Sequence, residues 1–247
     1  MKKERLDKIV ASSMGVSRSE AGKLVRSGAV TLAGAALRNP SLRLDAQAAA
    51  LACGARELNA KQHVTLMLHK PAGVLSASRD ARAKTVVDLL PPEYARRGLF
   101  PAGRLDKDAT GLLLLTDDGE LAHRVISPKK HVWKTYEVLL AAAPDAAQLD
   151  AVQNSITLAD GQRCLPAVAV RTPKPNVVLV RIREGKYHQI KRMFAAAGNA
   201  VAGLKRTAVG GLALDEGLAP GEYRELGETD IARIFEQPAP LTPESFA

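Results

Sequence analysis

A run of four leucines, Leu112 to Leu115, constrains the fold of this 247-residue chain more than any other segment. The run is continuous rather than alternating, and it is followed by Asp117-Asp118-Gly119, which is typical of a tight turn. A short continuous apolar segment bounded by turn residues predicts a strand that is buried in a core. Asp106 lies just before this strand, so we expect its carboxylate at a rigid strand edge.

The composition predicts a sizeable core and no membrane-spanning segment. Hydrophobic residues make up 46% of the chain, yet no apolar run reaches about eighteen residues. The first five residues lack the apolar segment of a signal peptide, so we expect a cytoplasmic protein. Cys53 and Cys164 have no His or Cys at metal spacing beside them, which predicts neither a zinc site nor a disulfide framework.

Positive charge is concentrated in the first part of the chain. The formal net charge is +9, and residues 1–45 carry nine Lys and Arg against four acidic residues. Residues 215–247 carry two Arg against eight acidic residues. A segregated basic segment favours a polyanionic partner.

Residues 1–45 predict two helices followed by a hairpin. Apolar side chains recur at helix spacing within residues 5–13. The sequence Ser17-Arg18-Ser19-Glu20 is a capping box that begins a second helix, and Gly28 would end it. Residues 30–34 have the pattern of a strand and a turn. Residues 46–62 show neither strand alternation nor a clean helical face, which indicates the end of a domain and a linker.

This segment resembles an S4 RNA-binding domain, which implies an S4 domain at residues 1–50 and a linker at residues 51–62. In that module the two helices present basic side chains to structured RNA. Lys and Arg neutralise phosphates and release counterions, which makes the affinity sensitive to salt. Charge alone would favour two solvated helices with ordinary surface charge, but the ordered match favours RNA. The matching basic residues are Arg5, Arg18, Lys23 and Arg26.

The segment Gly103-Arg104-Leu105-Asp106, with Thr110-Gly111 and the leucine run after it, resembles the signature of RsuA-type pseudouridine synthases. These enzymes modify small- or large-subunit ribosomal RNA, and the resemblance implies that Asp106 is the essential catalytic residue. It also implies an α+β protein whose catalytic domain, residues 63–235, has a mainly antiparallel sheet and a central cleft. We expect residues 236–247 to form a loosely ordered tail.

Two further segments resemble family motifs. Residues 70–73, Lys-Pro-Ala-Gly, match a segment that lines the substrate cleft, where Lys70 would contact phosphate. A solvent-facing lysine in a Pro-Gly turn is the alternative. Residues 134–139 match the second motif, in which Tyr136 packs against the target base and can move its ring proton. A core tyrosine that only packs is the alternative there.

Residues 177–194 read as a strand, a glycine turn and a helix. In the family, the basic residue after His-Gln-Ile pairs with the catalytic aspartate, and here it is Lys191. A cation at this place favours the ionised carboxylate and fixes its direction. Many related enzymes have arginine here. Lysine offers a single ammonium charge in place of a planar guanidinium that can donate two parallel hydrogen bonds to a carboxylate. The Tyr-His before Gln189 is typical of the small-subunit branch. We expect further RNA contacts from Lys134, Lys186, Tyr187, His188 and Arg192.

The implied chemistry needs no cofactor and no metal. Pseudouridine formation breaks the glycosidic bond of a uridine, turns the uracil and rejoins it through carbon, so one carboxylate acts where sugar and base separate. Asp106 could act as a nucleophile or as a base. Arg104 would fill the gap left by the extruded base, with an ion pair to Asp108 as its alternative. A glycosidase using Asp106 and Asp108 is disfavoured because the basic segments suit a polyanion.

The resemblance therefore implies a monomeric enzyme that isomerises one uridine in 16S small-subunit ribosomal RNA. We expect the RNA to be part of a small-subunit assembly intermediate, and we expect no membrane partner. The first alternative is the same chemistry on 23S large-subunit RNA. The second is a noncatalytic ribosomal RNA-binding assembly factor, which the joint presence of Asp106, Tyr136 and Lys191 disfavours.

Overall fold

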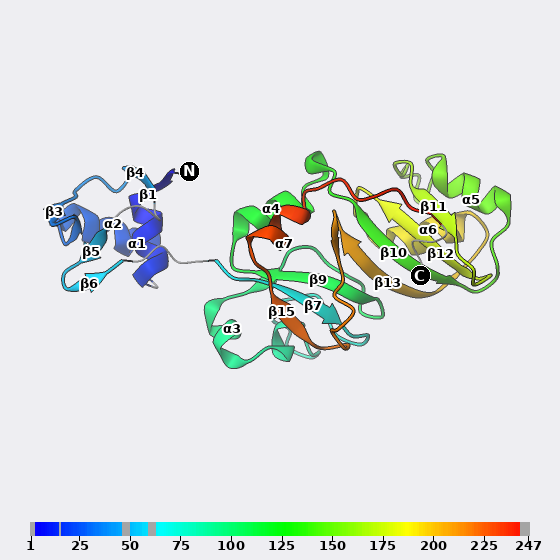
Figure 1. Ribbon diagram of the computed structural model, residues 1–247, viewed down its shortest axis with the longest axis horizontal. Coiled ribbons are helices and arrows are strands. Elements are labelled where there is room, and N and C mark those ends of the chain that lie inside the picture. The colour runs from blue at the N-terminus through cyan, green and yellow to red at the C-terminus, as the bar shows by residue number, and fades with distance from the viewer. Residues whose placement is uncertain (1–2, 15, 46–49, 59–62, 243–247) are drawn as a thin grey trace. The chain divides into compact units, whose positions relative to one another are not determined.

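The computed structural model describes residues 3–14, 16–45, 50–58 and 63–242. The chain forms two compact units, Met1–His63 and Val64–Ala247 (Figure 1). None of the helices in these described stretches combines the length and the apolar character needed to cross a membrane. Each unit has its own hydrophobic core.

The described residues of the first unit form two helices and two small sheets. The helices pack together through an apolar core that includes Leu6, Ile9 and Val25, each at most 2% exposed. The elements are α1 (Leu6–Met14), α2 (Arg18–Ser27), the antiparallel pair β1 (Lys3–Arg5) and β4 (Arg43–Asp45), and a sheet in the order β3 (Ala35–Ala36), β2 (Val30–Leu32), β5 (Leu51–Cys53), β6 (Arg56–Glu57).

Both ends of α2 have the predicted caps. Ser17 Oγ accepts a hydrogen bond from the backbone N–H of Glu20, and the Glu20 carboxylate accepts one from the N–H of Ser17 at 2.9 Å. Gly28 follows the helix with φ 83°, a left-handed conformation that glycine adopts without strain. The capping box and the glycine stop are therefore confirmed.

The predicted end of the first domain at residue 50 was wrong. Strand β5 pairs with β2, and β6 pairs with β5, so residues 51–57 belong to the four-stranded sheet. Leu51 and Leu58 are 3% and 2% exposed in the core of this unit. These strands are only three and two residues long, too short for a visible alternation of polar and apolar residues. The rest of the predicted linker, residues 59–62, lies outside the described residues.

The second unit is built on a mostly antiparallel sheet, as predicted for an α+β protein. Among the strand pairs described in this sheet, only β13 with β9 is parallel. Within the described residues the sheet has nine strands, in the order β11 (Val168–Arg171), β12 (Val177–Ile182), β10 (Lys134–Leu140), β13 (Val201–Val209), β9 (Thr110–Thr116), β7 (Thr65–Lys70) and β15 (Tyr223–Glu225), with β14 (Leu212–Ala213) paired to β13 and β8 (Phe100–Pro101) paired to β9.

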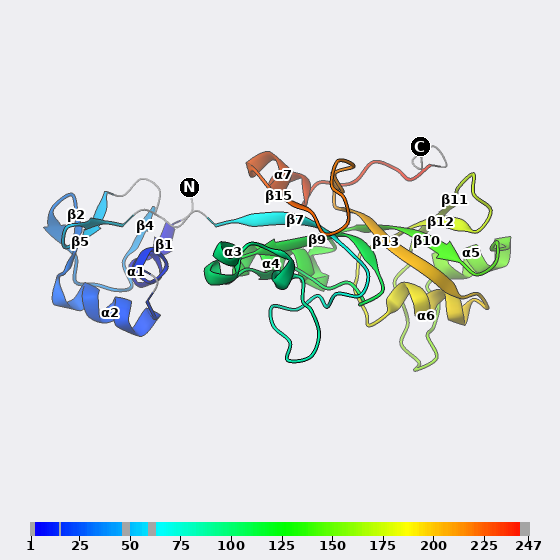
Figure 2. The ribbon, with the colours of Figure 1, turned by 90° about the horizontal axis from the view of Figure 1, so that it is seen from below.

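Five α-helices accompany the sheet in the part of the chain that is described. Figure 2 shows α6 below the strands β10, β12 and β13, and the chain that follows α7 above them. The helices are α3 (Pro92–Arg97), α4 (Gly119–Ile126), α5 (Ala146–Gln153), α6 (Gln189–Ala196) and α7 (Glu228–Arg233), and short 3-10 turns occur at Val87–Leu89 and Pro128–Lys130.

The leucine run forms β9, which is buried on both faces as predicted. Leu113 and Leu115 belong to one hydrophobic cluster, and Leu112 and Leu114 belong to a second one. All six residues of strand β7 are buried as well. This strand lies between β9 and β15, and its side chains also divide between the two clusters.

The parallel contact between β9 and β13 requires a glycine. Gly111 has φ 100°, and a Cβ on it would lie 2.2 Å from the carbonyl oxygen of Arg206. Only glycine therefore lets the two strands approach this closely. The Arg206 side chain reinforces the junction by donating from Nε to the Leu112 carbonyl at 2.7 Å.

The predicted loose tail begins against the second unit. Gln237 accepts a hydrogen bond from the Trp133 indole at 3.1 Å, and the Ala239 carbonyl accepts one from Arg181 at 2.7 Å. Residues 236–242 thus follow the sheet, although they form no helix or strand. Residues 243–247 lie outside the described residues.

Candidate active site around Asp106

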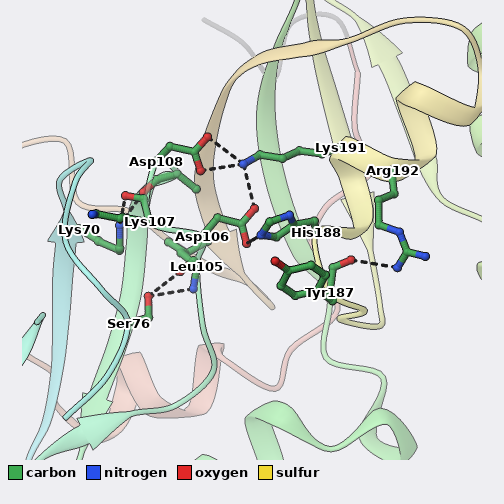
Figure 3. A network of polar contacts seen from close by, with 11 residues as sticks. Lys70, Ser76, Leu105, Asp106, Lys107, Asp108, Tyr187, His188, Lys191 and Arg192 are labelled. Carbon is green, nitrogen blue, oxygen red and sulfur yellow. Dashed lines mark hydrogen bonds and ion pairs between the residues drawn. The ribbon is translucent and has the colours of Figure 1, made fainter. Parts of the chain in front are cut away.

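Asp106 lies in the loop between β8 and β9, and buried polar groups hold the backbone beside it (Figure 3). Ser76 Oγ accepts a hydrogen bond from the N–H of Leu105 at 3.0 Å and donates one to its carbonyl at 2.8 Å. Both backbone groups of the residue before Asp106 are therefore fixed by one buried hydroxyl. Sequence reasoning missed Ser76, because nothing near it in the sequence marks a contact 29 residues away.

Lys70 supports the same loop, so its predicted role as a phosphate contact was wrong. The side chain is fully buried, and its ammonium donates to the carbonyls of Pro71, Lys107 and Ala109 at 3.0, 3.2 and 2.8 Å. Burial lowers the pKa of Lys70 to about 8, against the opposite effect of the Asp108 and Asp106 charges. The lysine thus ties three backbone carbonyls together, and the Lys107 carbonyl also accepts a hydrogen bond from the N–H of Gly73 at 2.7 Å.

The structure brings Lys191 to Asp106, as the sequence predicted. Its ammonium lies 3.1 Å from Oδ2 of Asp106 and also 2.7 and 2.8 Å from the two carboxylate oxygens of Asp108 (Figure 3). Asp108 shares this cation with Asp106, although the Asp108 side chain is 73% exposed. One ammonium therefore serves two carboxylates two residues apart.

Lys191 and Asp108 stabilise each other's charged forms. The hydrogen bond from Lys191 lowers the pKa of Asp108. Burial of Lys191 lowers its own pKa, but the bonds to Asp108 and Asp106 outweigh that effect and raise it above its ordinary value. The lysine therefore remains a cation beside Asp106.

His188 approaches Asp106 from the other side. Its Nε2 lies 3.5 Å from Oδ1 of Asp106, and its backbone is left-handed with φ 48° immediately before α6. The ring of Tyr187 stacks on the imidazole, with centroids 3.8 Å apart and planes at 18°. The sequence predicted both residues as RNA contacts, but it did not predict that the imidazole faces the carboxylate of Asp106.

Two other predicted RNA contacts near α6 have carboxylate partners within the protein. Lys186 forms an ion pair with Glu184, and Arg192 forms one with Asp160. Arg192 also donates to the Tyr187 carbonyl at 3.2 Å. Sequence spacing could not reveal the Arg192 partner, because Asp160 comes from a distant loop.

The remaining predicted residues of this unit have different surroundings. Tyr136 is 8% exposed on β10 and packs in the main core. The Lys134 ammonium donates to the Val125 carbonyl at 3.3 Å, and burial, with a smaller effect of Arg206, lowers its pKa to about 8. The ammonium is thus directed at a backbone carbonyl, and its contact with RNA stays a prediction. Arg104 is exposed, and its suggested partner Asp108 binds Lys191 instead.

In the first unit, the four predicted RNA-binding residues divide into two pairs. Arg5 and Arg18 both bind the carboxylate of Asp7, which is 7% exposed. These bonds, the one from Arg5 first, lower the pKa of Asp7 to about 2. Lys23 and Arg26 are exposed on α2. The first pair therefore has a structural role in addition to any contact with RNA.

The described residues contain no group of three or more His, Cys, Asp or Glu side chains arranged to hold a metal ion. The chemistry of this site is that of one carboxylate with a cation on one oxygen and an imidazole on the other.

The chain belongs to the RNA pseudouridylate synthase family, whose model matches residues 64–196, and the S4 domain model matches residues 4–48. It is thus a pseudouridine synthase with an N-terminal S4 domain.

Similar proteins cover nearly the whole chain. The chain is 44% identical to the RNA pseudouridine synthase YtzG of Bacillus subtilis, whose description calls it uncharacterized, over 95% of this chain and 100% of that protein. It is 42% identical to ribosomal small subunit pseudouridine synthase A of Escherichia coli and 40% identical to that of Vibrio cholerae, covering 99% of each and 93% and 94% of this chain. A crystal structure of a pseudouridylate synthase, 38% identical, superposes with a TM-score of 0.67 over 93% of this chain and 99% of that one.

Proposed function

We propose that this enzyme converts one uridine of 16S small-subunit ribosomal RNA to pseudouridine. The observation that carries the proposal is the similarity, over almost the full length of both proteins, to two enzymes named for the ribosomal small subunit. The Tyr187-His188 pair supports the same branch, because it resembles the motif of the small-subunit enzymes. The 44% identity to YtzG carries no information on the substrate.

Asp106 is the proposed catalytic residue. Its side chain is 21% exposed, and Lys191 holds Oδ2 while Oδ1 faces His188. An ionised carboxylate held in this way can attack the sugar carbon or remove a sugar proton. In both routes the uracil leaves the sugar, turns and rejoins through carbon, and Lys191 orients the carboxylate for its reaction with the sugar.

Two further residues complete the proposed reaction site. Tyr136 would pack against the target base and move its ring proton, which suits a phenol held in the core away from bulk water. Arg104 is exposed close to Asp106 in sequence and would fill the stack that the extruded uridine leaves. Extruding the uridine costs roughly a few kcal/mol, so a side chain that takes its place in the base stack reduces that cost.

The S4 domain would hold the RNA outside the reaction site. Lys23 and Arg26 on α2 are the strongest candidates for phosphate contacts, because Arg5 and Arg18 also bind Asp7. We propose a small-subunit assembly intermediate as the substrate, bound by a monomer in the cytoplasm. Comparing free 16S RNA with partly assembled particles in a turnover assay tests the form of the substrate.

Pseudouridine mapping of ribosomal RNA from cells that lack this protein tests the function. The cells are rescued with the wild type or with Asp106→Asn. We expect one small-subunit site to disappear and to return only with the wild type. Loss of a site in 23S RNA would contradict the proposed substrate while keeping the chemistry. No loss at any ribosomal site would contradict the ribosomal assignment.

A further inference from the structure

Tyr187 presents one face of its ring to solvent beside the catalytic carboxylate. The residue is 76% exposed, and among the exposed large hydrophobic side chains of the described residues it is the only aromatic one. Its inner face stacks on His188, whose Nε2 lies 3.5 Å from Asp106 (Figure 3). The outer face of Tyr187 is therefore one ring further from the reacting centre than the imidazole.

The protein holds this ring pair in place before any RNA binds. His188 has φ 48°, a conformation that is uncommon for residues other than glycine. Arg192 donates to the Tyr187 carbonyl at 3.2 Å, and the N–H of Lys186 donates to the Gln189 side chain at 2.9 Å. A platform ordered in this way loses little conformational entropy when a ligand stacks on it.

The cations around the ring pair already have carboxylate partners. Lys186 pairs with Glu184, Arg192 pairs with Asp160, and Lys191 is shared by Asp106 and Asp108. A phosphate at this turn would have to compete with those carboxylates. The outer face of Tyr187 has no such competitor, and aromatic faces are the usual stacking partners of unpaired bases.

We propose that the outer face of Tyr187 is a stacking site for an unpaired nucleobase adjacent to the target uridine. The target uridine itself belongs to Asp106 and Tyr136, so the base on Tyr187 is a neighbour on its 5′ or 3′ side. His188 supports the ring from below and links this site to the catalytic carboxylate. The inference rests on the proposed function, because it takes ribosomal RNA as the ligand.

The test measures RNA binding by the full chain carrying Asp106→Asn, so that turnover does not alter the RNA. The probe is a 16S RNA fragment containing the mapped uridine, either intact or with an abasic residue on its 5′ or 3′ side. We expect Tyr187→Ala to raise the Kd for the intact fragment about 5- to 150-fold, which corresponds to the loss of one base–aromatic stack. Tyr187→Phe keeps the ring and should restore the affinity.

The abasic fragments separate stacking from a structural effect. With the abasic residue at the stacked position, Tyr187→Ala should cause no further loss, whereas with it on the other side the full loss should remain. The proposal is overturned if Tyr187→Ala binds the intact fragment within about twofold of its parent. It is also overturned if the loss of affinity from Tyr187→Ala and the loss from the abasic residue multiply at the 5′ and the 3′ position alike. 2-Aminopurine at the stacked position should be quenched by Tyr187→Phe and not by Tyr187→Ala.

Two controls keep the result specific. Leu139→Ala removes another exposed apolar side chain, 39% exposed on β10, and should bind all fragments as its parent does. Pseudouridine formation by the wild type on the intact fragment is measured separately. Absence of pseudouridine both on this fragment and on small-subunit assembly particles would contradict the proposed function, while the Kd values still decide the stacking site.

Discussion

The ammonium of Lys191 lies 3.1 Å from Asp106 and 2.7 Å from Asp108, so the proposed catalytic carboxylate shares its cation with an exposed neighbour. Asp106 is the less exposed of the two, with 21% of its side chain accessible against 73% for Asp108. Solvent screens a pair more strongly the more exposed it is. The bond to Asp106 should therefore carry the functional effect.

Removing the charge of Lys191 should slow the reaction more than it weakens RNA binding. Lys191→Met should lower the single-turnover rate roughly 10²-fold, because the carboxylate loses its positioned counter-charge. Lys191→Arg should recover most of the rate, since a guanidinium can make the same contact. Asp108→Asn is the matched control and should stay within about threefold of the wild type. Equal losses in Lys191→Met and Asp108→Asn would contradict this assignment.

Replacing the catalytic carboxylate should separate chemistry from binding. Asp106→Asn keeps the shape of the side chain but removes the negative charge that either route requires. We expect turnover on 16S RNA to fall at least about 10³-fold, with the Kd for RNA nearly unchanged. Pseudouridine detection and filter binding on the same RNA give the two quantities. Unchanged turnover would remove Asp106 from the mechanism.

Lys70 should affect stability and its dependence on alkaline pH. Lys70→Met leaves three carbonyls without their donor, and we expect the free energy of unfolding to fall by at least about 2 kcal/mol. Because burial lowers the folded pKa to about 8 from 10.5, the unfolded chain binds more protons between those values. The contribution of Lys70 to stability should therefore rise as the pH increases from 8 to 10.5. Below pH 8 it should be constant.

Urea unfolding of the wild type and Lys70→Met at pH 7 and pH 10 measures that difference. Lys134 also has a pKa near 8, so Lys134→Met is the control for a general effect of buried lysines. The difference in free energy of unfolding between the wild type and Lys70→Met should increase from pH 7 to pH 10. An unchanged difference would contradict the lowered pKa of Lys70.

Asp7 should make the first unit sensitive to acid. Its pKa is about 2 in the folded protein against 3.8 in the unfolded chain, so the folded state binds fewer protons in that interval. The resulting stabilisation, about 2 kcal/mol, should be complete above pH 5 and be lost as the pH falls through 3.8 toward 2. Hydrogen exchange of α1 and α2 peptides measures it. Arg5→Gln should reduce the effect, and Asp7→Asn should abolish the pH dependence in this range.

The salt dependence of RNA binding should identify the phosphate contacts of the S4 domain. Lys23→Gln with Arg26→Gln should weaken binding and reduce the slope of log K against log salt by about 0.7 to 0.9 per lost contact. Arg18→Gln should also reduce the slope, and it should destabilise the first unit because it removes a partner of Asp7. An unchanged slope in the double variant would reject the contact assignment on α2.

The sequence predicted the elements whose causes are local. The capping box at Ser17–Glu20, the buried strand β9 and the strand, turn and helix that bring Lys191 to Asp106 all follow from patterns within about twenty residues. The match to a family motif predicted the Asp106–Lys191 ion pair, which pattern alone could not. The short strands β5 and β6 were missed because they are defined by pairing with β2, not by their own alternation.

Polar groups at the site were predicted less well than the strands. Lys70 and Lys134 look like surface cations in sequence, but both ammonium groups donate to carbonyls inside the protein. Whether a lysine faces RNA or its own backbone depends on which carbonyls the fold leaves unpaired, and that is a property of tertiary structure. The sharing of Lys191 by Asp108 was hidden for the same reason.

The junction of β9 with β13 has a consequence for the order of events during synthesis. Arg206 meets Leu112 across 94 residues, and the helix that carries Lys191 immediately precedes β13. The first unit, by contrast, is built from residues that all leave the ribosome before β7 does. Contacts between distant residues form late because a long loop must close first. A nascent chain that has reached only α5 therefore contains every element of its RNA-binding unit but still lacks the lysine and the strand that complete its active site.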